Sequence, residues 1–198
     1  MNKIELEKIK VNAIENHIPI IMDETLEVIA KYLLEIKPKR ILEIGSAVGY
    51  SAMCFSEYLD EDGIIDTIEK DEERYNQAVE NIKNCEIDKN INLIFGDAVE
   101  EIEKLKNNKY DIIFIDANKG KYPYYLEKAI PMLNVGGYIF ADNVLYKGYV
   151  LSDYNKHKQR TAVTHLRQYL GDVSSNDKLE TTLLEVGDGL CISKKVKE

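Results

Sequence analysis

The sequence of 198 residues contains no apolar run close to the roughly 20 residues that a bilayer-spanning helix needs. Its N-terminal residues are charged and lack the apolar core of a signal peptide. Cysteine is also scarce: Cys54, Cys85 and Cys191 lie far apart and form neither a C-x-x-C pair nor a metal-binding spacing. These absences predict a cytoplasmic protein without a membrane partner, with reduced thiols packed in its core.

Internal repeats, low-complexity segments and linkers are absent as well. The sequence therefore predicts one domain over residues 1–198, with N-terminal helices in residues 1–36 and a core in residues 40–194. Hydrophobic residues make up 44% of the chain, as in ordinary globular proteins. The formal net charge is -9, which favours solubility and gives no overall support for binding nucleic acid.

From residue 40 onward, apolar strand-like runs alternate with segments of helical periodicity. The expected strands are residues 41–44, 64–68, 92–95, 111–115, 137–141, 179–186 and 190–193. The expected helices between them are residues 50–59, 71–85, 98–105, 122–133 and 158–170. This alternation predicts an α/β fold with a parallel sheet and helices on both of its faces. Gly187-Asp188-Gly189, between the last two strands, predicts a closing antiparallel hairpin.

Polar side chains follow two of the most apolar expected strands. Asp116 ends one strand and Lys119 follows three residues later, while Asp142 and Asn143 end another. Ligands of parallel sheets bind outside the carboxyl ends of the strands. Two carboxylates and an amide oxygen are hard ligands that suit Mg²⁺, Mn²⁺ or Ca²⁺ rather than zinc. The pattern predicts a divalent-metal site that orients a substrate hydroxyl, with Lys119 placed to accept or steer its proton.

A glycine-containing turn, from Gly45 to Gly49, follows the first expected strand. Glycines allow a tight turn and a close approach of the backbone to a ligand. The G-x-x-x-G spacing differs from the G-x-G-x-x-G of dinucleotide sites, so a pyrophosphate cradle is disfavoured. Glu43 lies just before the turn, where it can bind a cationic or hydrogen-bonding group of a ligand.

Acids also stand at the ends of the next two expected strands. Glu69 lies 20 positions after Gly49, where an acid binds the hydroxyls of a ribose. Asp97 and Ala98 end the third strand, near the expected place of an adenine ring. Taken alone, Glu69 can be a helix N-terminal acid and Asp97 an N-cap. Their joint placement at successive strand ends favours a nucleoside-containing cofactor.

These motifs resemble those of class I S-adenosylmethionine-dependent methyltransferases. More narrowly, they resemble the cation-dependent O-methyltransferases, which include catechol and caffeoyl-CoA O-methyltransferases. The resemblance lies in the glycine loop from Leu42 to Ser51 and in Phe114 to Lys119, together with Asp142-Asn143. Within this family the chain is most similar to the bacterial tRNA 5-hydroxyuridine methyltransferases, through Asp142 to Gly148 and Val186 to Lys194.

The resemblance implies a Rossmann-like fold with a mostly parallel seven-stranded sheet, a C-terminal antiparallel hairpin and helices on both faces. It also implies S-adenosyl-L-methionine and Mg²⁺ (or Mn²⁺ or Ca²⁺) as cofactors, and a homodimer. The implied cofactor-binding residues are Ile21, Glu43, Gly45, Ser51, Glu69, Asp97, Ala98 and Asp116. The implied metal ligands are Asp116, Asp142 and Asn143, and the implied catalytic residues are Lys119 and Asp116. Relatives often carry a hydroxyl where Ala98 stands, so Ala98 is expected to act through its backbone.

The methyl acceptor that the resemblance implies is 5-hydroxyuridine in tRNA, converted to 5-methoxyuridine. One locally basic segment follows the metal motif, with Lys147, Lys156, Lys158, Arg160 and Arg167 against the single acid Asp153. Such residues bind RNA phosphates, although the same pattern occurs on a solvated helix face. A 5-hydroxyuracil carries a hydroxyl beside a carbonyl, as a catechol carries two adjacent oxygens. A small catechol-like or phenylpropanoid substrate is therefore the alternative.

Two further classes of function are weighed against this interpretation. A nucleotide-binding oxidoreductase is disfavoured because the G-x-G-x-x-G motif is missing. A non-catalytic interaction module is disfavoured because the acidic, amide and lysine side chains of the chemical motif are all present. We also expect Tyr122 and Tyr146 to flank the substrate pocket.

Overall fold

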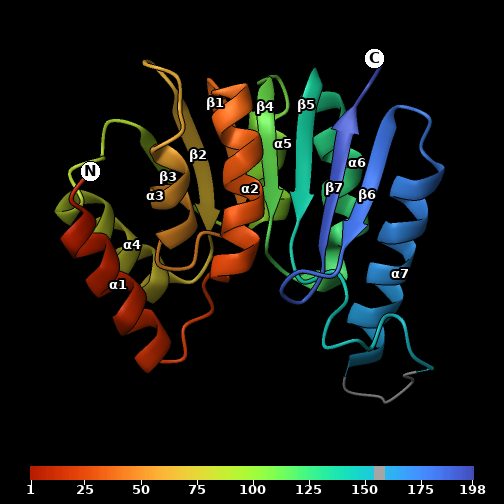
Figure 1. Ribbon diagram of the computed structural model, residues 1–198, viewed down its shortest axis with the longest axis horizontal. Coiled ribbons are helices and arrows are strands. Elements are labelled where there is room, and N and C mark those ends of the chain that lie inside the picture. The colour runs from red at the N-terminus through yellow and green to blue at the C-terminus, as the bar shows by residue number, and fades with distance from the viewer. Residues whose placement is uncertain (154–158) are drawn as a thin grey trace. The chain divides into compact units, whose positions relative to one another are not determined.

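The computed structural model describes residues 1–153 and 159–198 (Figure 1). These residues fall into two compact units, Met1–Lys104 and Leu105–Glu198. Among the described helices, none is both long enough and apolar enough to cross a membrane.

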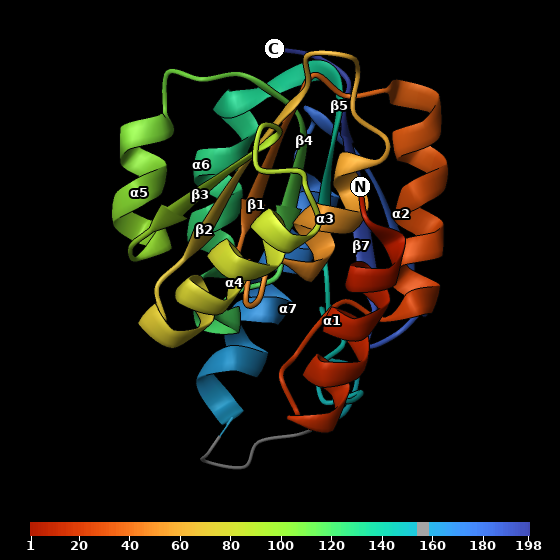
Figure 2. The same cartoon turned by 90° about the vertical axis from the view of Figure 1, so that its left-hand side faces the viewer.

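The first unit alternates helices with three short strands. Its elements are α1 (Lys3–Glu15), α2 (Asp23–Ile36), β1 (Arg40–Ile44), α3 (Tyr50–Ser56), β2 (Ile64–Glu69), α4 (Glu72–Asn84), β3 (Ile91–Phe95) and α5 (Ala98–Leu105). Strand β2 pairs in parallel with β1 on one side and with β3 on the other. Figure 2 shows α2 and α5 on opposite sides of these strands. Both sheet faces of this unit are therefore covered, as the near-continuous apolar runs predict.

The second unit carries four strands and two long helices. Its elements are β4 (Tyr110–Ile115), the 3-10 turn η1 (Lys119–Lys121), α6 (Tyr122–Met132), β5 (Leu133–Ala141), α7 (Arg160–Ser175), β6 (Leu179–Leu184) and β7 (Leu190–Lys195). Helix α7 packs against α6, η1 and β6. This packing brings a helix from late in the chain against the turn that carries Lys119.

The seven strands form one sheet in the order β3-β2-β1-β4-β5-β7-β6. Strands β4 and β5 are parallel, whereas β7 runs antiparallel to both β5 and β6. The predicted α/β fold with a closing antiparallel hairpin is confirmed, and most expected elements are present within a few residues of their predicted bounds.

Strand β5 is longer than the sequence predicts, because it begins at Leu133 rather than at residue 137. Leu133 pairs with Tyr110, and the next pair is Ile112 with Tyr138, so the residues between bulge out of the β4 pairing. A Cβ atom on Gly137 would lie 2.5 Å from the Asp111 carbonyl oxygen. Glycine is thus needed for a close strand approach here, and not for the chain reversal that its sequence context indicates.

Helix α7 also departs from its predicted bounds of 158–170. Its predicted first residue, Lys158, lies outside the described residues, and the helix continues past Gly171 to Ser175. Glycine is a poor helix former, which makes residue 170 a reasonable predicted end. The buried side chain of Val173 adds one more anchored turn, so tertiary packing extends the helix beyond its local signal.

Candidate active site

The glycine turn is fastened to the end of β2. Gly45 (φ 99°), Ala47 (φ 46°) and Gly49 (φ 82°) all have left-handed backbone conformations. The amides of Gly45 and Ser46 both donate to the Ile68 carbonyl at 3.1 Å. A Cβ atom on Gly49 would lie 3.4 Å from the Ala78 Cβ, so α4 packs closely against the start of α3. The sequence prediction of a tight turn before a helix is confirmed.

Glu43 is completely buried at the end of β1. Its two carboxylate oxygens accept hydrogen bonds from Ser51 Oγ and Thr67 Oγ1, each at 2.5 Å. Glu43 and Ser51 are both among the residues that the resemblance implies for cofactor binding, whereas Thr67 is not. The signal for Thr67 is its register, because it is the partner of Glu43 in the β1–β2 pairing. These two bonds fix the orientation of the Glu43 carboxylate beside the start of the glycine turn.

Glu69 is buried at the end of β2 and holds the same turn. Its carboxylate accepts from the amide of Ala47 at 2.8 Å, and from those of Lys70 and Asp71 at 2.9 and 2.8 Å. Lys70 and Asp71 immediately precede α4, so the acid also supports the helix start. Glu69 therefore shapes the glycine turn directly, in addition to the ribose contact that its position predicts.

Asp97 caps a helix, as one of its two sequence interpretations expects. Its Oδ1 accepts from the Val99 amide at 2.9 Å in the first turn of α5. Its other oxygen lies 3.9 Å from the Lys70 Nζ and its side chain is half exposed, so it remains accessible to a ligand. Ala98 begins α5, and Ile21 is a buried core residue just before α2.

In the second unit, the residues that are predicted to bind a metal and to accept a proton lie close together. The register pairs Ile115 with Ala141, so Asp116 and Asp142 follow neighbouring strand ends. The turn η1 then directs Lys119 back toward them. Lys119 Nζ lies 2.7 Å from Asp116 Oδ1 and 3.0 Å from Asn143 Oδ1. The predicted convergence of these side chains is therefore observed.

Tyr122, which is expected to flank the substrate pocket, has a further role that the sequence does not indicate. Its side chain is completely buried, and its hydroxyl lies 2.8 Å from both the Asp142 carbonyl oxygen and Lys119 Nζ. The hydroxyl also lies 3.2 Å from the Ile115 carbonyl oxygen. Burial, followed by the charges of Asp116 and Asp142, raises the pKa of Tyr122 well above its ordinary value. Tyr122 thus remains a neutral hydroxyl that ties two strand ends to Lys119.

The Asp142 carboxyl is almost completely buried. Burial, and next the charge of Asp116, raises its pKa to about 7, although the Asn143 amide donates to it at 2.8 Å. A nearby cation would favour its charged form. Two oxygen ligands, from Asp116 and Asn143, already converge on an ammonium group, so this donor set fits a hard cation.

The fit of a hard cation to this site depends on the Asn143 amide as well as on the carboxyl groups of Asp116 and Asp142. Within the described residues, no cluster of three or more histidine, cysteine, aspartate or glutamate side chains is arranged for a metal. The candidate set has only two carboxylates, and Asn143 supplies the third ligand.

The basic segment is described only in part. Lys156 and Lys158 lie outside the described residues, whereas Lys147 and Arg160 are exposed. Arg167 donates to the carbonyl oxygens of residues 149, 150 and 152. These bonds use three of the five N–H donors of the guanidinium, so Arg167 is held against this segment as a structural arginine.

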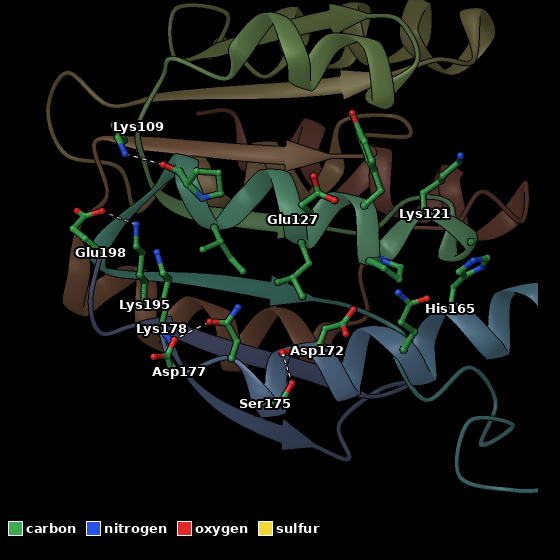
Figure 3. A pocket seen from close by; sticks show the side chains of 18 residues that line it. Lys109, Lys121, Glu127, His165, Asp172, Ser175, Asp177, Lys178, Lys195 and Glu198 are labelled. Atoms are coloured by element: carbon green, nitrogen blue, oxygen red, sulfur yellow. Dashed lines mark hydrogen bonds and ion pairs between the residues drawn. The ribbon is translucent and has the colours of Figure 1, made fainter.

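A groove of about 1140 Å³ lies between α6 and α7 (Figure 3). His165 and Lys121 lie at one end of it, beside the turn η1, but none of the predicted site residues lines it. Its lining carries lysines at both ends and carboxylates along its length, including Glu127 and Asp172. This mixture of charges does not favour a polyanionic ligand.

Comparison with known proteins gives the family of the chain. A family model described as O-methyltransferase matches residues 3–196. The tapetum-specific methyltransferase 1 of Arabidopsis thaliana is 33% identical over 171 residues, 81% of this chain and 71% of that protein. The caffeoyl-CoA O-methyltransferase of Stellaria longipes is 32% identical over 175 residues, 83% of this chain and 71% of that protein. The crystal structure of an O-methyltransferase from Bacillus cereus in complex with SAH (S-adenosylhomocysteine) has a TM-score of 0.87 and 25% identity, covering 96% of this chain and 90% of that chain.

The chain therefore belongs to this O-methyltransferase family and has its Rossmann-like methyltransferase fold. It is an S-adenosylmethionine-dependent O-methyltransferase of the caffeoyl-CoA O-methyltransferase type. The roles of individual residues, the metal, the homodimer and the single-domain organisation stay predictions.

Proposed function

We propose that the protein uses a divalent cation, Mg²⁺ or alternatively Mn²⁺ or Ca²⁺, to methylate 5-hydroxyuridine in tRNA. The observation that carries the proposal is the convergence of the Asp116 and Asn143 side-chain oxygens on the single cationic group of Lys119. Asp142 follows the neighbouring strand end and would supply the third oxygen ligand. Such a set leaves positions for two adjacent oxygens of an acceptor.

When bound, the cation lowers the pKa of the acceptor hydroxyl and orients it. S-adenosylmethionine would supply the methyl group on its sulfonium: the acceptor oxygen would form the new bond to the methyl carbon, the carbon–sulfur bond would break, and S-adenosylhomocysteine would be the leaving group. The Lys119 amine, in its neutral form, would accept the proton of the hydroxyl. Tyr122 holds the lysine at this point through its neutral hydroxyl. Positioning for in-line transfer supplies much of the rate.

The cofactor is assigned to the residues of the first unit. Glu43, held by Ser51 and Thr67, faces the start of the glycine turn, and Glu69 keeps the turn in shape while binding ribose hydroxyls. Asp97 and the backbone of Ala98 lie at the third strand end, where adenine is expected.

Glu69→Ala is expected to weaken S-adenosylmethionine binding by about 1.5–3 kcal/mol, the range for hydrogen bonds to a charged group. The variant loses the ribose acceptor and also releases the Ala47 amide from its present partner. Calorimetric titration with the cofactor measures the effect. Glu72→Ala is the matched control, because Glu72 is an exposed acid of the next helix. Unchanged affinity in a Glu69→Ala protein with wild-type circular dichroism would remove Glu69 from the ribose site.

The tRNA acceptor is supported by the basic segment, of which Lys147 and Arg160 are exposed. Bases that undergo chemistry in RNA are presented from single-stranded loops, where a small active site can reach them. The second candidate is a small catechol-like or phenylpropanoid acceptor. It is favoured by the relatives that are named caffeoyl-CoA O-methyltransferases.

Incubation with hypomodified tRNA and labelled S-adenosylmethionine, followed by nucleoside mass analysis, distinguishes the two candidates. The tRNA proposal expects label in 5-methoxyuridine, and loss of that label in excess EDTA. If the protein methylates catechol well but leaves 5-hydroxyuridine tRNA untouched at low salt with metal present, the small-molecule candidate replaces it. The implied homodimer is tested separately by sedimentation.

Replacing Lys156, Lys158 and Arg160 together with alanine is expected to weaken tRNA binding and to flatten its salt dependence. Each lost phosphate contact reduces the slope of log affinity against log salt by about 0.9 on duplex or 0.7 on single strands. Filter binding over a series of salt concentrations measures the slope. Methylation of catechol by the same variant serves as the control, because these residues would not touch a small acceptor. A slope equal to that of the wild type would contradict phosphate binding by this segment.

A further inference from the structure

The segment that follows β5 has an unusual backbone. Asn143 (φ 55°), Tyr146 (φ 47°) and Lys147 (φ 58°) all adopt the left-handed conformation, followed by Gly148 (φ 72°). Residues other than glycine adopt it at a cost, and a cluster of them persists only where the surrounding structure holds it. The contacts that hold residues 143–152 therefore matter for function, because Asn143 belongs to the proposed cation site.

Arg167, on α7, holds one side of this segment. Its Nε donates to the Val150 carbonyl oxygen at 3.0 Å. Its Nη2 donates to the Tyr149 carbonyl oxygen at 3.1 Å and also to that of Ser152. The planar guanidinium is suited to such a set of acceptors, since its donors are fixed in one fork.

The turn between β6 and β7 holds the other side. The Lys147 amide donates to Asp188 Oδ1 at 2.6 Å, and the Leu145 amide donates to the Asp188 carbonyl oxygen at 2.9 Å. The Val144 amide donates to the Gly189 carbonyl oxygen at 2.9 Å. The segment is thus fixed between a helix and a hairpin turn, both from the second unit.

Hydrogen bonds connect the arginine contacts to the site. The Tyr149 amide donates to the Tyr146 carbonyl oxygen at 3.1 Å, and the Tyr146 amide donates to the Asn143 carbonyl oxygen at 3.2 Å. Asn143 Oδ1 in turn contacts Lys119 Nζ at 3.0 Å. A displacement of the carbonyls that Arg167 binds would therefore be transmitted to Asn143 through two consecutive turns.

The same segment presents two aromatic rings. Tyr146 and Tyr149 meet edge to face, with ring centroids 6.1 Å apart and an interplanar angle of 80°. Both side chains are half exposed, in contrast to the completely buried Tyr122. Planar bases and catechols bind on exposed aromatic rings, which suit them because every such acceptor has a π face.

We propose that Arg167 is a positioning residue that fixes the segment 143–152, and that the Tyr146–Tyr149 pair on this segment is the surface on which the planar acceptor binds. Only the identity of the acceptor in this inference rests on the proposed function. Arg167 acts through the three carbonyls and not through its charge. The role therefore differs from the phosphate contact that its place in the basic segment indicates.

The experiment compares Arg167→Lys, which keeps the charge but lacks the fork, with Arg167→Gln, which loses both. The wild type and the neighbouring Gln168→Ala are the references, because Gln168 is exposed on the same helix. Amide hydrogen exchange of residues 144–152, the KM and kcat for catechol and for hypomodified tRNA, and S-adenosylmethionine affinity are measured for each.

Both Arg167 variants are expected to exchange faster in residues 144–152 and to raise the acceptor KM by about tenfold, the lower range for outer positioning residues. The S-adenosylmethionine affinity of both Arg167 variants should match that of the wild type. Gln168→Ala should match the wild type in all of these measurements. Tyr149→Leu should raise the acceptor KM without faster exchange. If Arg167→Lys matches the wild type while Arg167→Gln does not, the charge of Arg167 is what matters, and the proposed positioning through three carbonyls is refuted. Unchanged exchange in both Arg167 variants refutes it as well.

This design separates the inference from the proposed function. A wild type that leaves 5-hydroxyuridine tRNA unmethylated overturns the tRNA proposal, whereas the exchange rates and the catechol KM still decide the role of Arg167. If Tyr149→Leu leaves every acceptor KM unchanged, the aromatic surface is refuted, whatever the exchange data show.

Discussion

Asp142→Ala is expected to abolish methyl transfer while leaving S-adenosylmethionine affinity nearly unchanged. Asp142 is buried at the end of β5, whereas the cofactor residues Glu43, Glu69 and Asp97 belong to the first unit. Loss of one carboxylate ligand should lower kcat by roughly a thousandfold, equivalent to about 4 kcal/mol of lost stabilisation by the cation. Activity with and without EDTA, Mn²⁺ binding and cofactor calorimetry measure the separate effects. Full wild-type activity in excess EDTA would refute the proposed requirement for a divalent metal.

Asp142→Asn is the matched control, because it keeps the size of the side chain and removes only its charge. The raised pKa of Asp142 means that the folded protein disfavours the charged carboxylate. Without metal, the wild type should lose stability relative to the variant as the pH rises from the ordinary aspartate pKa of 3.8 to about 7. Thermal melting in metal-free buffer should therefore favour Asp142→Asn above pH 7 and show no advantage at pH 3.

Lys119→Met is expected to lower kcat by about 10²–10⁴, the contribution of a positioned acid or base. Lys119 Nζ contacts the side chains of Asp116, Tyr122 and Asn143, so its place is fixed by several partners. Methionine keeps the length of the side chain and removes its ability to carry a proton. Single-turnover rates with saturating metal and cofactor measure the effect on the transfer step.

Lys121→Met provides the comparison, because Lys121 is exposed on the same turn η1 and contacts no predicted site residue among those described. Mn²⁺ affinity should be retained or strengthened in Lys119→Met, since a competing positive charge is removed. A transfer rate equal to that of the wild type would eliminate Lys119 as the base and leave the proton to solvent.

The residues that end apolar strands are the ones that sequence predicts best. Asp116 and Asp142 follow runs whose burial is evident from composition, and the parallel pairing of β4 and β5 makes their proximity a consequence of fold class. The glycine turn between Glu43 and Ser51 is predicted equally well, since a strand, a short turn and a helix leave few alternative geometries.

The remaining contacts depend on registers and packing that no local pattern specifies. Thr67 binds Glu43 only because β1 and β2 pair in one register, and Tyr122 is buried only because α6 begins directly under two strand ends. Arg167 is of the residue type that binds phosphate, yet three of its donors bind backbone carbonyls of the segment that ends at Ser152. The start of β5 is missed for a similar reason, because Gly137 is required by the neighbouring strand and not by a turn.

The position of Lys119 has a consequence for how the protein is assembled. The ammonium lies among oxygens that would otherwise repel one another, so the chain supplies its own counter-ion to the acceptor site. The oxygens of Asp116 and Asn143 are therefore already partnered when the chain folds, whether or not a metal is supplied. A cation bound here would share these oxygens with the lysine, so its affinity would depend on the same group that is proposed to accept the proton.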